Sequence, residues 1–328
     1  MTNRRRVLIA LGAAAFTTPL SVTAQQQRGK IARVGYLGST SAAAGKSRIE
    51  ALRAGLRELG YVEGKNLVME LRWADDRYEL LPQLAAELVR LKVDVIVTHG
   101  TPGTRAAKQA TSTIPIVMAI AGDAVVTGLI TNITRPGSNV TGSTFSNPEL
   151  AAKRLEVLRD TLPRIRRVAV LKNPDNPAMG LVLKAMEQSA QSLKLELQEV
   201  AVRAPEELES AFAGMGAKRA EAVVVIEDAM LNGNIKRIAD LAARHRLPSI
   251  GLPELAEFGG FIAYGVDIVQ RFHRAAFFVD KILKGTKVSD LPVERATKFE
   301  LIINKKTAKA IGVAIPPELL LRADKVIE

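Results

Sequence analysis

Two short stretches of the chain have residue types that could together bind a nucleotide. Gly45-Lys46-Ser47 repeats the last three residues of a phosphate-binding P-loop, and Glu227-Asp228 follows an apolar stretch, where such enzymes carry their magnesium ligands. A P-loop also needs a glycine at position 40, and this chain has Thr40 there. Because that glycine shapes the loop whose amides wrap the phosphates, the sequence does not predict nucleotide hydrolysis.

The residue patterns of other enzyme classes are also absent from the sequence. There is no Gly-x-Ser-x-Gly elbow and no cysteine, and the three histidines His99, His245 and His273 do not have the spacing of metal ligands. We therefore expect neither catalysis nor a metal or cofactor. His99 differs from the other two because it directly follows an apolar stretch, where it would be either a structural loop residue or a ligand contact.

Small polar and acidic residues recur directly after the apolar stretches of the chain. Hydroxyl groups ahead of a helix bring backbone N–H groups and the positive end of the helix dipole to one place, which suits a carboxylate or another small anion. N-capping explains each residue equally well, whereas their recurrence favours a binding site. The candidate ligand-binding residues are Ser39, Thr40, Thr101, Asp123, Asn173, Asp228 and Tyr264.

Two chemical roles follow from these residue types. Ser39 and Thr101 would hold the anionic end of a solute, because hydroxyl groups donate hydrogen bonds. Asp228 would pair with an ammonium group if the solute has one. The sequence therefore predicts that a small polar solute binds through both of its ends.

The elements that would position these side chains alternate between strand and helix along almost the whole chain. Compact apolar stretches such as 31–37, 93–97 and 114–120 are each followed by residues with helical spacing. A stretch rich in Gly, Thr, Ser and Asn, residues 121–150, separates two such series. Repeated βα units build parallel sheets whose ligand-binding loops lie at the carboxyl ends of the strands. We therefore expect an α/β protein with two doubly wound, Rossmann-like lobes.

The first 24 residues have the layout of a secretory signal peptide. Arg4-Arg5-Arg6 precedes an apolar run from Val7 to Phe16, and Val22-Thr23-Ala24 is typical of a cleavage site. The arginines also fit a twin-arginine signal, and the sequence does not decide between this export route and general secretion. We expect a periplasmic protein from which residues 1–24 are removed, with an uncleaved membrane anchor as the alternative.

The basic charge of the chain does not indicate a nucleic-acid partner. The net charge is +12, and removal of residues 1–24, which hold three arginines and no acids, lowers it to +9. The remaining lysines and arginines are spread over predicted helices beside glutamates, and aromatic residues make up only 4% of the chain. We interpret most of this charge as solvated helix faces.

Four stretches of the mature chain have a recognisable pattern: residues 53–119, RPGSNVTGST (135–144), VLKNPDNP (170–177) and the terminal residues 298–328. Together they resemble the bacterial ABC-transporter substrate-binding proteins, including the tryptophan- and tyrosine-binding proteins of some Gram-positive bacteria. The resemblance implies a type I periplasmic-binding fold, in which three segments form a hinge between the lobes. These crossings would fall near residues 140–145, 264–268 and 290–296.

The resemblance also implies how the chain is divided and what it does. Lobe 1 would contain residues 29–140 and 267–292, and lobe 2 would contain residues 141–266 and 293–328. We expect a monomeric receptor of an ABC importer that captures a small polar solute, such as an amino acid or related carboxylate, and presents it to a permease in the inner membrane. The alternative is a ligand-sensing module for a membrane kinase, which the genes beside its own would distinguish.

Overall fold

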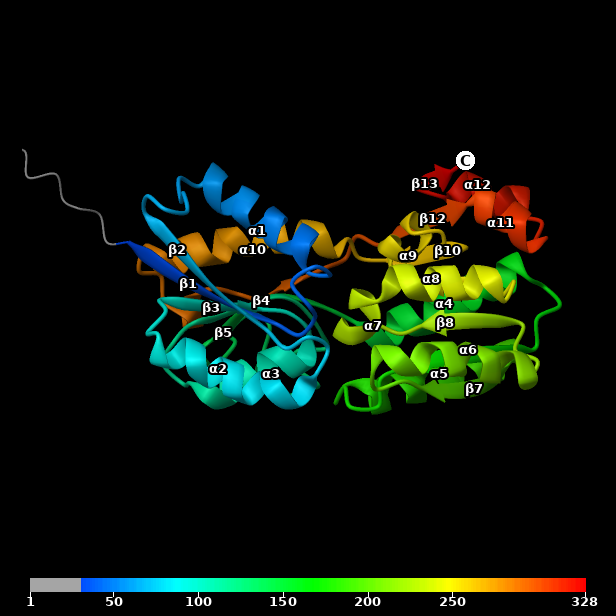
Figure 1. The fold of residues 1–328 in the computed structure, drawn as a ribbon, viewed down its shortest axis with the longest axis horizontal. Helices are drawn as coiled ribbons and strands as arrows, with labels where there is room; N and C mark the ends of the chain where they lie inside the picture. Colours follow the sequence, from blue (N-terminus) through cyan, green and yellow to red (C-terminus); the bar gives the residue numbers. More distant parts are fainter. Residues whose placement is uncertain (1–30) are drawn as a thin grey trace, which may run out of the picture. The chain divides into compact units, whose positions relative to one another are not determined.

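The structure, a computed structural model, describes residues 31–328, so the predicted signal peptide lies outside the described residues. Two sheets form the framework (Figure 1). The first sheet has the strand order β11-β5-β4-β3-β1-β2 and is parallel throughout. Its strands are β1 (Ala32–Gly38), β2 (Leu67–Trp73), β3 (Val95–Thr98), β4 (Ile116–Gly122), β5 (Val140–Phe145) and β11 (Glu294–Arg295).

The second sheet has the order β13-β12-β10-β9-β8-β6-β7, and only its β10–β12 pair is antiparallel. Its strands are β6 (Arg167–Lys172), β7 (Glu196–Ala201), β8 (Ala222–Val225), β9 (Ser249–Gly251), β10 (Ile262–Gly265), β12 (Glu300–Asn304) and β13 (Lys325–Ile327). The sequence analysis does not predict β13, because three residues are too few to show a periodicity.

Helices cover both faces of the first sheet, which explains why β4 and residues 95–97 of β3 are apolar without interruption. Helices α1 (Lys46–Glu58) and α10 (Ile268–Leu283) lie on one face, and α2 (Leu81–Arg90) and α3 (Gly100–Ala110) lie on the other (Figure 1). In β3, Val95 and Val97 pack toward the first pair while Ile96 packs toward the second. The short turns η1 (Tyr78–Leu80) and η3 (Val288–Asp290) complete this lobe.

The second sheet is covered in the same way. Helices α4 (Asn147–Thr161) and α5 (Met179–Leu193) pack on one face, and α6 (Leu208–Ala217) and α8 (Ile235–Arg244) pack on the other. The remaining elements of this lobe are η2 (Pro205–Glu207), α7 (Ala229–Gly233), α9 (Pro253–Glu257), α11 (Lys305–Ile311) and α12 (Pro317–Arg322).

The chain passes between the sheets three times within residues 31–328. It crosses from β5 to α4, from β10 to α10, and from β11 to β12. Helix α10 packs against α1, and Gly55 makes this close approach possible because a Cβ there would lie 2.6 Å from the carbonyl oxygen of His273. The three-segment hinge and the two parallel-dominated lobes are therefore confirmed.

The lobe boundaries expected from the sequence differ from sheet membership at two strands. β5 pairs with β4, and β11 pairs with β5, so both strands belong to the first sheet rather than to the second lobe. The sequence of β5 resembles a loop because it contains hydroxyl residues and glycine. These hydroxyls are nevertheless buried, since Thr141 donates to the carbonyl of Leu291 (2.9 Å) and Thr144 to that of Ala121 (2.9 Å).

We predict that Gly142→Ala destabilises the protein by about 2–4 kcal/mol, measured by urea denaturation. Gly142 has a φ of +124°, and a Cβ there would lie 2.0 Å from the carbonyl oxygen of Met118 in the neighbouring strand. Gly180→Ala in α5 is the matched control, because its Cβ would meet nothing within 4 Å and helix propensity favours alanine by ~0.5–1 kcal/mol. Equal stabilities of the two variants would contradict this account of β5.

Candidate ligand-binding site

A cavity lies where the carboxyl ends of strands from both sheets meet. The space between its lining atoms is about 470 Å³, including the part open to solvent. Its lining residues lie at or just after the carboxyl ends of β3, β4 and β5 from the first sheet and of β6, β8, β9 and β10 from the second. Parallel sheets place their ligand-binding loops at these strand ends.

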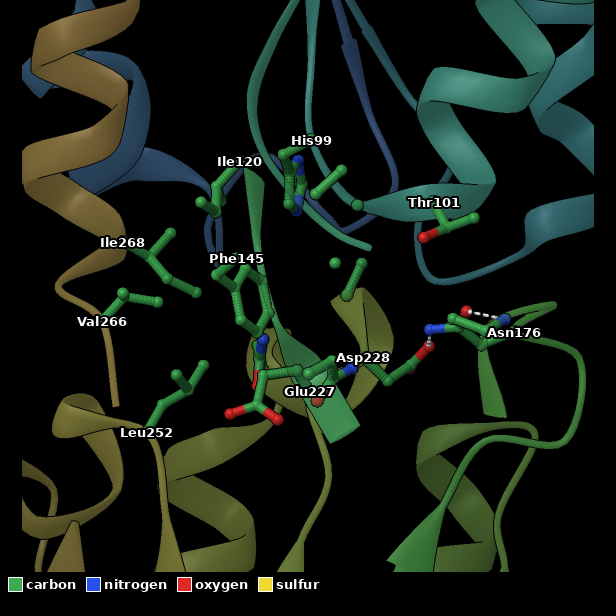
Figure 2. Close-up of a pocket in the computed structure, with 17 residues that line it drawn as sticks. His99, Thr101, Ile120, Phe145, Asn176, Glu227, Asp228, Leu252, Val266 and Ile268 are labelled. Carbon is green, nitrogen blue, oxygen red and sulfur yellow. Dashed lines mark hydrogen bonds between the residues drawn. The ribbon is translucent and has the colours of Figure 1, made fainter. Parts of the chain in front are cut away.

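The cavity has an apolar side and a polar side (Figure 2). Figure 2 shows Thr101, Asn176 and Asp228 on the side opposite the apolar residues. The apolar side is formed by Ile120, Phe145, Leu252, Val266 and Ile268. The lining therefore suits a solute that combines polar groups with an apolar body.

The carboxylate of Asp228 is already saturated by donors from the protein. Its oxygens accept from Tyr78 Oη (2.7 Å), Asn176 Nδ2 (3.0 Å), Asn173 Nδ2 (3.3 Å) and the backbone N–H groups of Met230 (3.0 Å) and Leu231 (3.2 Å). Burial raises the pKa of Asp228, and these hydrogen bonds act in the opposite direction. Asp228 therefore caps α7 and links the lobes through Tyr78, and it has little acceptor capacity left for a ligand ammonium group.

The neighbouring Glu227 has the opposite environment. Its side chain is 7% exposed and lines the cavity; Oε1 contacts the guanidinium of Arg154, and Oε2 has no hydrogen-bond partner within residues 31–328. It forms an ion pair with Arg154, whose side chain is fully buried. Arg154 also donates through Nε to the carbonyl of Tyr264 (2.8 Å) and through Nη1 to that of Val225 (3.0 Å). Glu227 is therefore the cavity carboxylate with acceptor capacity for a solute.

His99 supplies an uncharged polar group on the first-lobe side of the cavity (Figure 2). It precedes α3 and is 3% exposed, and Arg48 Nη1 lies 3.3 Å from its Nε2. Burial, together with the charge of Arg48, lowers the pKa of His99 to about 3. The imidazole is therefore neutral at physiological pH.

The first turn of α3 adds backbone donors beside His99. Gly100 and Thr101 line the cavity, and Gly100 adopts a φ of +70°, which glycine allows without strain. The first N–H groups of a helix have no partner within the helix and attract negative charge. This end of the cavity is therefore suited to a carboxylate.

Of the seven residues expected from the sequence, only Thr101 and Asp228 line the cavity. Asn173 lies behind Asp228 and donates to it. Ser39 is buried beside α3, where a Cβ on Gly103 would lie 3.3 Å from its Oγ. Thr40 is buried too, and its methyl group would lie 2.7 Å from a Cβ on Gly233 in α7.

The other two expected residues have structural contacts near the hinge. Asp123 Oδ2 accepts from the backbone N–H of Asn147 (3.0 Å), and its own N–H donates to the carbonyl of Phe145 (2.8 Å). The ring of Tyr264 stacks on Phe299 at a centroid distance of 5.8 Å. Neither residue lines the cavity.

Sequence reasoning did not select Glu227, which lines the cavity, and it left the role of His99 open. The signal for both was their position directly after a buried strand, the same signal that selected Asp228. The apolar lining could not be recognised, because residues such as Phe145 and Leu252 have the same residue types as the core.

A model of the ABC transporter substrate binding proteins matches residues 40–327, which is most of the chain. The chain belongs to this family. Its members bind small molecules outside the cytoplasm and work with a transporter permease, and they are solute-binding proteins rather than enzymes.

Individual relatives agree with this assignment. The chain is 26% identical over 259 residues to the tyrosine-binding protein of Clostridioides difficile, covering 79% of this chain and 74% of that protein. A solved structure of a conserved domain protein from Vibrio cholerae is 28% identical, with a TM-score of 0.84 over 90% of this chain and all of that one. An ABC domain from Streptococcus pneumoniae, solved in complex with L-Trp, shares the fold at 23% identity, with a TM-score of 0.80 over the same shares of the two chains.

Other solved substrate-binding proteins share the fold at lower identity, which confirms the type I periplasmic-binding fold. None of the helices within residues 31–328 has both the length and the apolar character needed to cross a bilayer.

We predict that His99 makes the substrate-binding protein less stable in acid. Because its pKa is about 3 when folded and near 6.5 when unfolded, the unfolded chain binds the extra proton between these values. The free energy of unfolding of the wild type minus that of His99→Asn should therefore rise with pH, by up to about 1.4 kcal/mol per pH unit across this window. Urea denaturation from pH 4.5 to 7.5 measures it, with His245→Asn as the control. A difference that does not change with pH would contradict the prediction.

Proposed function

We propose that this protein is the solute receptor of an ABC importer and that its solute is an α-amino acid with an apolar or aromatic side chain. One observation carries the proposal: a single cavity combines a neutral donor end at His99 and α3, a carboxylate at Glu227 and an apolar wall. An α-amino acid has the complementary groups, namely a carboxylate, an ammonium group and a side chain.

The two charged ends of the solute would bind to different lobes. The carboxylate would accept hydrogen bonds from His99 and from the first turn of α3 near Thr101, and the ammonium group would donate to Glu227. Thr101 comes from the first lobe and Glu227 from the second. The solute can make both sets of contacts only when the lobes are together, so its binding would favour the closed arrangement.

Contacts between the lobes already stabilise this arrangement. Tyr78 Oη of the first lobe donates to Asp228 and accepts from the backbone N–H of Met230 (3.0 Å). Asn234 Nδ2 of the second lobe donates to Asp76 Oδ2 (3.1 Å). The expected ammonium partner Asp228 is therefore proposed here as part of the closure contacts, and Glu227 takes the ammonium role.

The side chain of the solute would lie against Ile120, Phe145 and Ile268. These residues form an apolar surface that suits an aromatic or branched side chain. The names of two relatives support this choice, since one is a tyrosine-binding protein and another was solved with L-Trp. The match to the ABC transporter substrate binding proteins over residues 40–327 supports transport rather than sensing.

We predict that L-tyrosine, L-tryptophan or L-leucine raises the thermal unfolding midpoint of the purified protein. A ligand that binds only the folded state adds about 2.7 kcal/mol of stability at a hundredfold excess over its Kd. The D-enantiomers are the controls, because three fixed contacts around the α-carbon discriminate between mirror images. If no amino acid in a complete set raises the midpoint, the proposed function is wrong.

We predict that Glu227→Gln weakens binding of an amino acid by about tenfold or more, because the charge-assisted hydrogen bond to the ammonium group is lost. Calorimetric titration with L-tyrosine and with its deaminated analogue, 3-(4-hydroxyphenyl)propionate, measures the effect. The variant should lose affinity for the amino acid but not for the analogue, which has no ammonium group.

Glu187→Gln is the matched control, because this substitution makes the same chemical change at an exposed position on α5, away from the cavity. It should bind both compounds as the wild type does. Comparing the two ligands within each variant separates the ammonium contact from any loss of stability caused by disturbing Arg154. Equal losses for both ligands would show that Glu227 does not contact the ammonium group.

A further inference from the structure

We propose that Arg48 is a positioning residue that keeps the proton of His99 on Nδ1, which makes His99 a hydrogen-bond donor to an acceptor oxygen of the bound solute. The inference rests on the proposed function for the identity of that oxygen, the carboxylate of an amino acid. The position of the proton itself follows from contacts within the protein.

The guanidinium of Arg48 is buried without a carboxylate partner in the described part of the chain. It comes from the first turn of α1 and is 4% exposed. Its hydrogen-bonding contact is with His99 Nε2, 3.3 Å from Nη1. Its charge also acts on Tyr36 and on Glu254, so these two groups and His99 are its titratable neighbours.

This contact determines which nitrogen of His99 carries the proton. An arginine side chain has five N–H donors and no acceptor, and it does not lose its proton in proteins. Nε2 must therefore accept, which means that it presents a lone pair to Arg48. A neutral imidazole has one N–H group, so that group is on Nδ1.

The donor on Nδ1 has no partner in the described part of the chain. Nδ1 is buried, and no protein acceptor lies within hydrogen-bond distance of it. A buried donor without a partner is costly, and proteins rarely leave one unless a ligand or water satisfies it. Because His99 lines the cavity, an oxygen of the solute is the natural acceptor.

The consequence is a specificity rule for this end of the cavity. An Nδ1–H group donates a hydrogen bond to a carboxylate or carbonyl oxygen and repels an ammonium group, which has only donors. The nearby positive charge of Arg48 also attracts a carboxylate and repels an ammonium group. Arg48 would therefore orient an amino acid with its carboxylate toward the first lobe, without contacting the solute itself.

The position of the proton can be measured in the ligand-free protein by NMR with ¹⁵N-labelled histidine, which distinguishes the two tautomers through long-range ¹H–¹⁵N correlations. We expect the Nδ1–H tautomer of His99 in the wild type and in Arg48→Lys, which keeps a donor. In Arg48→Met we expect the Nε2–H form to appear. An Nε2–H tautomer in the wild type, or an unchanged tautomer in Arg48→Met, would overturn the proposal.

The effect on the solute is tested with L-tyrosine and tyramine, which differ only in the carboxylate. Arg48→Met should lose about tenfold to a hundredfold of the affinity for L-tyrosine and change that for tyramine less than twofold, and Arg48→Lys should recover most of the loss. Equal losses for both compounds would show that Arg48 only supports packing. If the wild type binds no amino acid, the proposed function fails, while the tautomer measurement still decides the role of Arg48.

Discussion

The cleft depends on the buried ion pair between the guanidinium of Arg154 and the carboxylate of Glu227. A cation removed from water is stable only when it is paired and its donors are satisfied, and Arg154 meets this requirement with Glu227 and the carbonyls of Val225 and Tyr264. These partners lie at the ends of β8 and β10, whereas Arg154 itself comes from α4, the first helix after the β5 crossing. One side chain therefore fixes two strand ends and a hinge helix, and it holds the Glu227 carboxylate beside the cavity.

This arrangement gives the cavity a defined charge pattern. Glu227 is balanced by Arg154, the carboxylate oxygens of Asp228 accept from five uncharged donors, and His99 is uncharged because burial and Arg48 lower its pKa. The cavity therefore has one usable acceptor end and one donor end at nearly balanced charge. A zwitterion fits such a site better than a simple anion or cation does, because a single net charge would be left unpaired after desolvation.

Much of the fold could be predicted from the sequence, because strands that are covered on both faces show as continuous apolar stretches between helical ones. The two lobes and the location of the site at the strand ends follow from that alternation. The apolar pattern did not reveal a strand whose polar side chains are buried and hydrogen-bonded to the backbone. β5 has the composition of a loop, but it is a strand because it pairs with β4 and with β11, and its buried Thr141 donates to the carbonyl of Leu291.

The site itself was harder to predict than the fold, because a binding residue is defined by what its neighbours leave free. Glu227 and Asp228 are adjacent in the sequence and both carry a carboxylate. The acceptors of Asp228 are filled by donors that include Tyr78, 150 residues away, whereas Glu227 Oε2 has no partner in the described part of the chain. In the same way, His99 becomes a donor through Arg48, 51 residues away. The residue type and its place after a strand select candidates, and contacts between distant parts of the chain decide which of these candidates can still bind a solute.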